Sequence, residues 1–88
     1  MKKINLLIDG FHPGPVNMAI DQILGEESSA RTDECLLRFY GWEPPTITIG
    51  YHQPVSDLDL PALARDGVGW VRRMTGGGGV LHWNEVTY

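Results

Sequence analysis

The sequence is poor in cysteine and in cationic side chains, and each shortage excludes a class of protein. Cys35 is the only cysteine among the 88 residues, so no internal disulfide can reinforce a small core, and a reducing compartment fits best. Seven Lys and Arg side chains against eleven Asp and Glu give a formal net charge of −4. This balance argues against whole-domain binding to nucleic acid or to an anionic membrane surface.

Long apolar runs are missing as well. No segment approaches the roughly 20 apolar residues that a membrane-crossing helix needs. The first nine residues contain an apolar stretch, but Asn5 interrupts it and Asp9 ends it, so it is too short for a secretory signal. No nucleic-acid or membrane partner is therefore expected, and the expected location is the cytoplasm.

The apolar residues that are present, 42% of the chain, suffice for one small domain. Hydrophobic patterning and the turn residues between segments predict a strand, a helix, two strands, a second helix and two more strands. The expected strands are 3–9, 35–42, 46–49, 68–73 and 80–82, and a further strand is expected to begin at 85–88. The expected helices are 15–24 and 58–64, with a polar loop at 25–33 between the first helix and the next strand. Asp59 is the expected N-cap of the second helix, with Pro61 in its first turn. This order predicts an α+β fold with a mixed, mostly antiparallel sheet and short helices.

Asn17 stands out in the first predicted helix. Apolar residues such as Val16, Ile20 and Leu24 recur at three- and four-residue spacings and define one face, and Asn17 lies at its edge. Two interpretations are open: a tolerated surface residue, or a hydrogen-bonding group that reaches a ligand over the sheet.

The sequence ends in strand-forming residues, Val86, Thr87 and Tyr88, with no turn or cap after them. We therefore expect residues 1–88 to be an incomplete, N-terminal part of a single domain.

The most informative segment is a run of four glycines, 76–79, that follows Arg72 and Arg73. Main chain without side chains can approach a ligand closely, and its N–H groups can form a concave site for phosphate or carboxylate. The alternative is a mobile glycine hairpin with two solvated arginines. Because adjacent strand residues point to opposite sides, only one arginine should point into a given pocket, and the other should be structural.

Other site types fail on context. A Walker-type phosphate loop needs Lys-Ser/Thr and a helix after its glycines, and a dinucleotide fingerprint needs a strand-to-helix turn, whereas an extended segment, 80–82, follows here. His12, His52 and His82 lack the spacing of metal ligands, so no metal site is expected.

Three segments, 17–21, 37–53 and 72–82, together resemble lipoate–protein ligase A and the related octanoyltransferases. The resemblance implies the class II biotin/lipoate ligase-like α+β fold. It also implies substrate-binding roles for nine residues: Arg73 and the main chain of Gly76, Gly77, Gly78 and Gly79 at the acyl carbonyl or phosphate, Val80 and Trp42 in the acyl tunnel, His82 near the lipoyl group, and Asn17 beside the acyl chain.

No catalytic residue is assigned within the chain. The lysine that this family uses lies downstream of the glycine motif, and no lysine follows Lys3 here. Cys35 does not match the nucleophilic cysteine of the thioester-forming octanoyltransferases, which is also expected downstream.

The function that the resemblance implies is attachment of a lipoyl or octanoyl group to a lysine of a carrier domain. Lipoate or octanoate would be a substrate rather than a covalently bound cofactor, with ATP and Mg²⁺ needed in the case of a ligase. The implied partners are lipoyl carrier domains of 2-oxoacid dehydrogenase complexes or the glycine cleavage H protein, with acyl carrier protein as a further candidate. The alternatives are a non-catalytic acyl- or nucleotidyl-binding module and an inactive truncated remnant.

Overall fold

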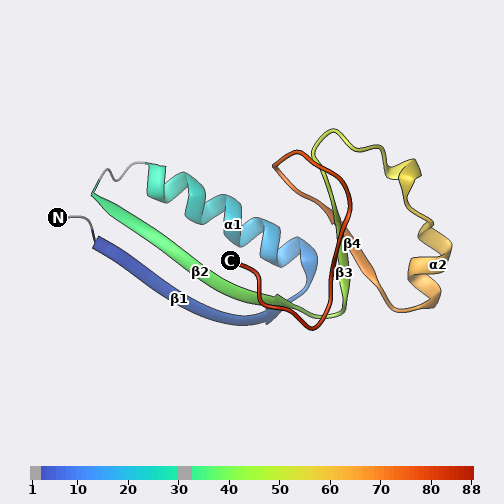
Figure 1. Cartoon of the computed structure of the whole chain (residues 1–88), viewed down its shortest axis with the longest axis horizontal. Coiled ribbons are helices and arrows are strands. Elements are labelled where there is room, and N and C mark those ends of the chain that lie inside the picture. The colour runs from blue at the N-terminus through green and yellow to red at the C-terminus, as the bar shows by residue number, and fades with distance from the viewer. Residues whose placement is uncertain (1–2, 30–32) are drawn as a thin grey trace.

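Two small sheets and two helices make up the fold in the computed structural model, which describes residues 3–29 and 33–88 (Figure 1). The elements in chain order are β1 (Lys3–His12), α1 (Gly14–Ser29), β2 (Glu34–Trp42), β3 (Thr46–Ile49), a 3₁₀ turn (Val55–Asp57), α2 (Leu60–Arg65), β4 (Gly69–Arg72) and β5 (Val80–His82). The first sheet joins β1 to β2, and the second has the order β4-β3-β5.

The predicted α+β fold class is confirmed, but the prediction of a mostly antiparallel sheet is wrong. Both β1 with β2 and β3 with β4 pair in parallel, and only β3 with β5 is antiparallel. The reason is that α1 and α2 each connect the two strands of a parallel pair, and a helical crossover returns the chain in its original direction. The consecutive strands β2 and β3 belong to different sheets.

Helix α1 is longer than its sequence pattern predicts. It continues to Ser29, so the expected polar loop was wrong for 25–29, while 30–32 lie outside the described residues. Gln22 donates to Glu26 one turn later, from Nε2 to Oε1 at 3.3 Å. Gln and Glu are good helix formers, and pairs at this spacing support a helix after the apolar stripe has ended.

The second helix, α2, and a strand at residues 85–88 were both expected from local sequence signals. In α2, the Asp59 carboxylate caps the helix by accepting from the Ala62 amide at 3.2 Å, as predicted. The expected strand at 85–88 is reduced to a single antiparallel bridge between Tyr40 and Thr87. This bridge nevertheless fixes the last residues to the edge of β2.

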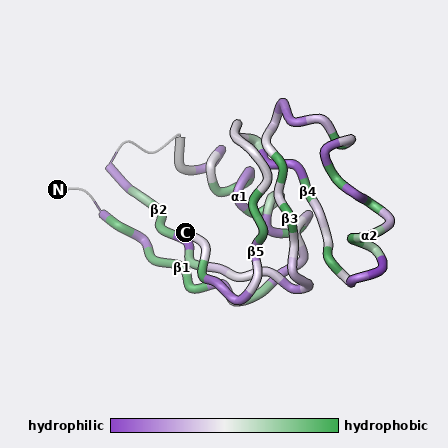
Figure 2. The backbone as a smooth tube through the Cα atoms, turned by 45° about the vertical axis from the view of Figure 1, so that its right-hand side comes forward, coloured by the Kyte–Doolittle hydropathy of each residue, from purple (hydrophilic) through white to green (hydrophobic). Residues whose placement is uncertain are grey.

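The core lies where α1 meets β2 and β3. Ile49, Thr46, Thr48 and Asn17 are fully buried there. By contrast, Ile4, Leu6 and Ile8 alternate along β1 and are 60–77% exposed, on a strand that is largely green in Figure 2. None of the helices in the described ranges is long and apolar enough to cross a membrane.

Candidate binding site

A cavity of about 200 Å³ lies between the core and residues 73–75, which precede the glycine run. Its walls come from α1, β2, β3, β5 and the C-terminal residues: Met18, Asp21, Tyr40, Trp42, Thr48, Arg73, Met74, Thr75, His82 and Thr87. The walls combine thioether and aromatic surface with one guanidinium group, one carboxylate, that of Asp21, and threonine hydroxyls. A cavity of this composition suits a ligand with an apolar body and a polar or anionic end.

Arg73 is held in this cavity by main-chain and hydroxyl oxygens. Its Nη1 donates to the carbonyl and the hydroxyl of Thr48, at 2.9 and 2.7 Å. Its Nη2 donates to the carbonyls of Gly76 and Gly78, at 2.9 and 2.8 Å. A guanidinium has five N–H donors, and within the described residues the Nε–H of Arg73 is the one without a partner. Arg73 can therefore offer a ligand its positive charge and this one donor.

Arg72 has a different task, as the alternation of strand residues predicts. Its Nη1 donates to the carbonyls of Gly50, Tyr51 and Gln53, all within 3.0 Å, and it does not line the cavity. It fixes the loop after β3. Neither arginine is simply solvated, so the alternative of a hairpin with two solvated arginines is wrong in that respect.

The glycine segment curls around the guanidinium of Arg73 and packs against β3. A Cβ atom on Gly50 would lie 2.0 Å from the carbonyl oxygen of Gly77, and Gly77 has a φ of +101°. Glycine is therefore needed at both positions, one for close approach and one for its backbone conformation. The carbonyls of Gly76 and Gly78 face Arg73, and the four glycines do not line the cavity. An anion site built from their amides remains a prediction.

His82 and Trp42 form an inner wall of the cavity, and their contacts with a ligand stay predictions. Their rings stack with centroids 4.2 Å apart, and each residue is 8% exposed. His82 Nε2 lies 2.9 Å from the hydroxyl of Thr48, and Nδ1 contacts the carboxylate of Glu85. Trp42 donates from Nε1 to the hydroxyl of Thr87 at 2.8 Å.

Asn17 and Val80 are not brought to this cavity. Asn17 is fully buried, so its interpretation as a surface residue is wrong. Its amide nitrogen donates to the carbonyl of Gly41 at 2.9 Å, and its Oδ1 accepts from Arg38 at 2.8 Å. Asn17 therefore ties α1 to β2. Val80 begins β5 beside Thr48 and is 45% exposed. Ligand contacts for both stay predictions.

A buried ion cluster behind the cavity was not predicted from the sequence. Arg38, 6% exposed, donates from Nε to Asp9 at 2.9 Å and from Nη1 to Asp21 at 2.8 Å. Asp21 also accepts from the hydroxyl of Tyr40 at 2.7 Å, and the Arg38 guanidinium lies 3.8 Å from the centroid of the Tyr40 ring. Burial, reinforced by the Asp21 carboxylate, raises the pKa of the Tyr40 hydroxyl. The cluster fixes two side chains of the cavity wall, those of Asp21 and Tyr40.

The ion cluster predicts how the free energy of unfolding depends on pH. The hydrogen bond from Arg38 holds the pKa of Asp9 below its ordinary value of 3.8. A carboxyl group with a lowered pKa in the folded state contributes stability above its unfolded pKa and loses it as the pH falls through the folded pKa. Asp9→Asn should therefore flatten the loss of stability between about pH 5 and pH 2, measured by urea unfolding. In an Arg38→Met background the same substitution should no longer flatten the acid limb; a flattening of the same size there would contradict the pairing.

Within residues 3–29 and 33–88, no group of three or more His, Cys, Asp or Glu side chains could hold a metal ion. The residues of the cavity itself offer binding and charge stabilisation by Arg73 beside apolar side chains.

The sequence is similar to that of known proteins along nearly its whole length. Residues 13–88 match the family profile of the "Lipoyl protein ligase A/B catalytic domain". The octanoyltransferase LipM of Geobacillus kaustophilus is 48% identical over 99% of this chain and 32% of its own length. The same enzyme of Moorella thermoacetica is 49% identical over 94% of this chain and 31% of its own length. The chain thus spans about one third of the length of these curated relatives.

Solved structures of similar proteins share the fold. The bipartite lipoate protein ligase of Thermoplasma acidophilum, described with its E2 lipoyl domain, superposes with a TM-score of 0.71 at 30% identity, over 93% of this chain and 32% of that one. A lipoate-protein ligase A bound with ATP gives a TM-score of 0.71 at 31% identity, over 93% of this chain and 33% of that one. A T. acidophilum structure with bound lipoic acid gives 0.66 at 32% identity, over 93% and 34%.

Proposed function

Because the chain belongs to the lipoyl protein ligase A/B catalytic-domain family, we propose that it binds a lipoyl or octanoyl group for transfer to a lysine of a carrier protein. Residues 1–88 would form the N-terminal, acyl-binding part of the catalytic domain. The observation that carries the proposal is the guanidinium of Arg73, fixed at the wall of a cavity that is otherwise lined by side chains such as Met18, Trp42 and Met74.

The apolar side chains would bind the acyl chain. Each methylene group that leaves water contributes about 0.8 kcal/mol, so a medium-length chain gains affinity from every carbon it buries beside Met18, Trp42 and Met74. The cavity would therefore select ligands by the length of the chain.

Arg73 would bind the polar end of the acyl group. Its free Nε–H can donate to a carbonyl, carboxylate or phosphate oxygen, and its charge stabilises the negative charge that develops when an amine attacks the acyl carbon. The amides of 76–79 are the second set of donors that we propose. The chain thus holds and polarises the acyl group, and none of its described residues is assigned as a nucleophile or base.

The substrates and partners follow from the same proposal. The similar ligases with bound lipoic acid and with bound ATP support lipoate or octanoate as the acyl substrate and ATP, with Mg²⁺, as the activating substrate of a ligase. The T. acidophilum ligase and its E2 lipoyl domain support a lipoyl carrier domain as acceptor. The glycine cleavage H protein and acyl carrier protein are further candidates.

The test is calorimetric titration of the chain with a non-hydrolysable octanoyl-adenylate analogue. Loss of one charge-assisted hydrogen bond should make Arg73→Ala bind about tenfold more weakly. Arg65→Ala, on exposed α2, is the matched control and should bind like the wild type. Absence of binding by the wild type, or equal affinity of the Arg73→Ala variant, would overturn the proposal.

A further inference from the structure

A continuous chain of hydrogen bonds leads from Arg73 to the C-terminal segment. Arg73 donates to the Thr48 hydroxyl at 2.7 Å, Thr48 lies 2.9 Å from His82 Nε2, and His82 Nδ1 contacts the carboxylate of Glu85. On the far side, the Thr87 hydroxyl donates to the same Glu85 oxygen at 3.1 Å. The Glu85 carboxylate is therefore the final acceptor of this series of hydrogen bonds.

The donors and acceptors of this chain can be assigned from their chemistry. A guanidinium only donates, so the Thr48 hydroxyl uses a lone pair for Arg73 and has its proton free for His82. The Glu85 carboxylate only accepts, so the Nδ1 atom that faces it carries a ring proton. In a neutral ring Nε2 is then unprotonated and accepts the proton that the Thr48 hydroxyl has left. The hydrogen-bond partners of His82 thus favour a proton on Nδ1.

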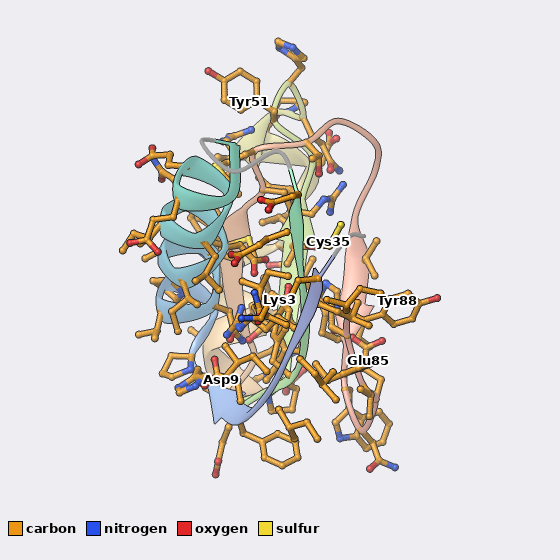
Figure 3. The ribbon with its side chains drawn as sticks, turned by 90° about the vertical axis from the view of Figure 1, so that its left-hand side faces the viewer. Lys3, Asp9, Cys35, Tyr51, Glu85 and Tyr88 are labelled. Atoms are coloured by element: carbon orange, nitrogen blue, oxygen red, sulfur yellow. The ribbon has the colours of Figure 1, made fainter. Side chains whose placement is uncertain are left out.

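The segment that carries Glu85 is itself anchored. The amide of Tyr40 donates to the carbonyl of Thr87 at 2.9 Å, and the amide of Thr87 donates back at 2.8 Å. In Figure 3, Glu85 and Tyr88 lie on the opposite side of the strands from α1. His82 is 8% exposed and stacked on Trp42, so its ring plane is fixed as well.

We propose that Glu85 is a positioning residue for the cavity. By holding the proton of His82 on Nδ1, it makes Nε2 accept from Thr48, and Thr48 in turn fixes the Nη1 end of Arg73. Arg73, the one Lys or Arg side chain of the cavity lining, is thereby held in place to receive an anionic head group. The identity of the ligand in this inference rests on the proposed function, whereas the tautomer of His82 does not depend on it.

The experiment is ¹⁵N–¹H long-range correlation spectroscopy on the full chain, with the His82 ring signals assigned by a His82→Gln variant. The wild type should show the Nδ1–H tautomer. Glu85→Ala should lose this preference and bind the octanoyl-adenylate analogue about tenfold more weakly, the equivalent of one charge-assisted hydrogen bond. Glu85→Gln, whose amide oxygen can accept from the same N–H, should keep both the tautomer and the affinity within about twofold.

The outcomes separate the two proposals. An Nε2–H tautomer in the wild type overturns the role of Glu85, and this result does not require Glu85→Ala to fold. A Glu85→Ala variant with a changed tautomer but an unchanged affinity for the analogue overturns it as well. Thr48→Val, which keeps the buried shape and the contact of His82 with Glu85, should keep the proton on Nδ1 and gives a second variant. If the wild type shows the Nδ1–H tautomer but does not bind the analogue, the proposed function fails, while the control of His82 by Glu85 stands.

Discussion

Replacing Arg38 with methionine is expected to remove about 3 kcal/mol from the free energy of unfolding, near the upper end of the cost of leaving a buried polar atom without its partner. The methionine side chain fills similar space but leaves the carboxylates of Asp9 and Asp21 without their cation, close to one another and partly shielded from water. It also leaves the Oδ1 of buried Asn17 without its donor. The side chains of Asp9 and Asp21 stay 22% and 33% exposed, so the largest cost is expected at the buried Asn17 oxygen, with repulsion between the two carboxylates added. Urea unfolding followed by tryptophan fluorescence measures the change.

Arg65→Met is the matched control. Arg65 pairs with Asp66 at 3.3 Å, but both side chains are more than 60% exposed, so its loss should cost less than about 0.5 kcal/mol. Adding Asp21→Asn to the Arg38→Met variant should restore part of the lost stability, because one of the unpaired charges is gone. Equal effects of the two arginine substitutions would show that the cluster does not stabilise the fold.

Gly50→Ala should be similarly damaging, at about 3 kcal/mol. The new Cβ would lie 2.0 Å from the Gly77 oxygen, a backbone atom that cannot rotate away. The glycine segment would have to move off β3, and the carbonyls of Gly76 and Gly78 would then leave Arg73. We therefore expect loss of both stability and affinity for the octanoyl-adenylate analogue, measured by thermal unfolding and by calorimetry.

Gly76→Ala separates this contact from a general effect of adding a methyl group. A Cβ on Gly76 meets nothing within 4 Å, and its φ lies outside the left-handed range. Its melting temperature should stay close to that of the wild type. If Gly76→Ala and Gly50→Ala unfold at the same temperature, the packing of 76–79 on β3 is not what holds the segment.

Local signals predicted the elements, whereas contacts distant in sequence decided the sheet. The predicted strands 46–49 and 80–82 coincide with β3 and β5, and the cap at Asp59 was found from its side chain and the proline that follows. The directions of the strands were not predicted correctly. Whether two strands pair in parallel depends on how the connection between them crosses over, and the local pattern of apolar residues carries no information on this.

Only part of the candidate site was predicted, because some of its residues come together from distant parts of the sequence. Alternation along a strand predicted that only one of the two arginines would line a pocket, and the family resemblance pointed to Arg73. The cluster around Arg38 was missed because Asp9 and Asp21 lie 29 and 17 residues away, at no recognisable spacing. One signal was available: a single cation between apolar neighbours in a strand needs an anionic partner if that strand is buried.

The register of β1 and β2 has a practical consequence. Cys35 is exposed and lies beside Ile4, on the face opposite the one from which Arg38 reaches α1. Since no second thiol competes, a fluorophore or spin label would attach at one defined point. Such a probe would report on any molecule that comes to rest on this apolar face without disturbing the cavity on the other side.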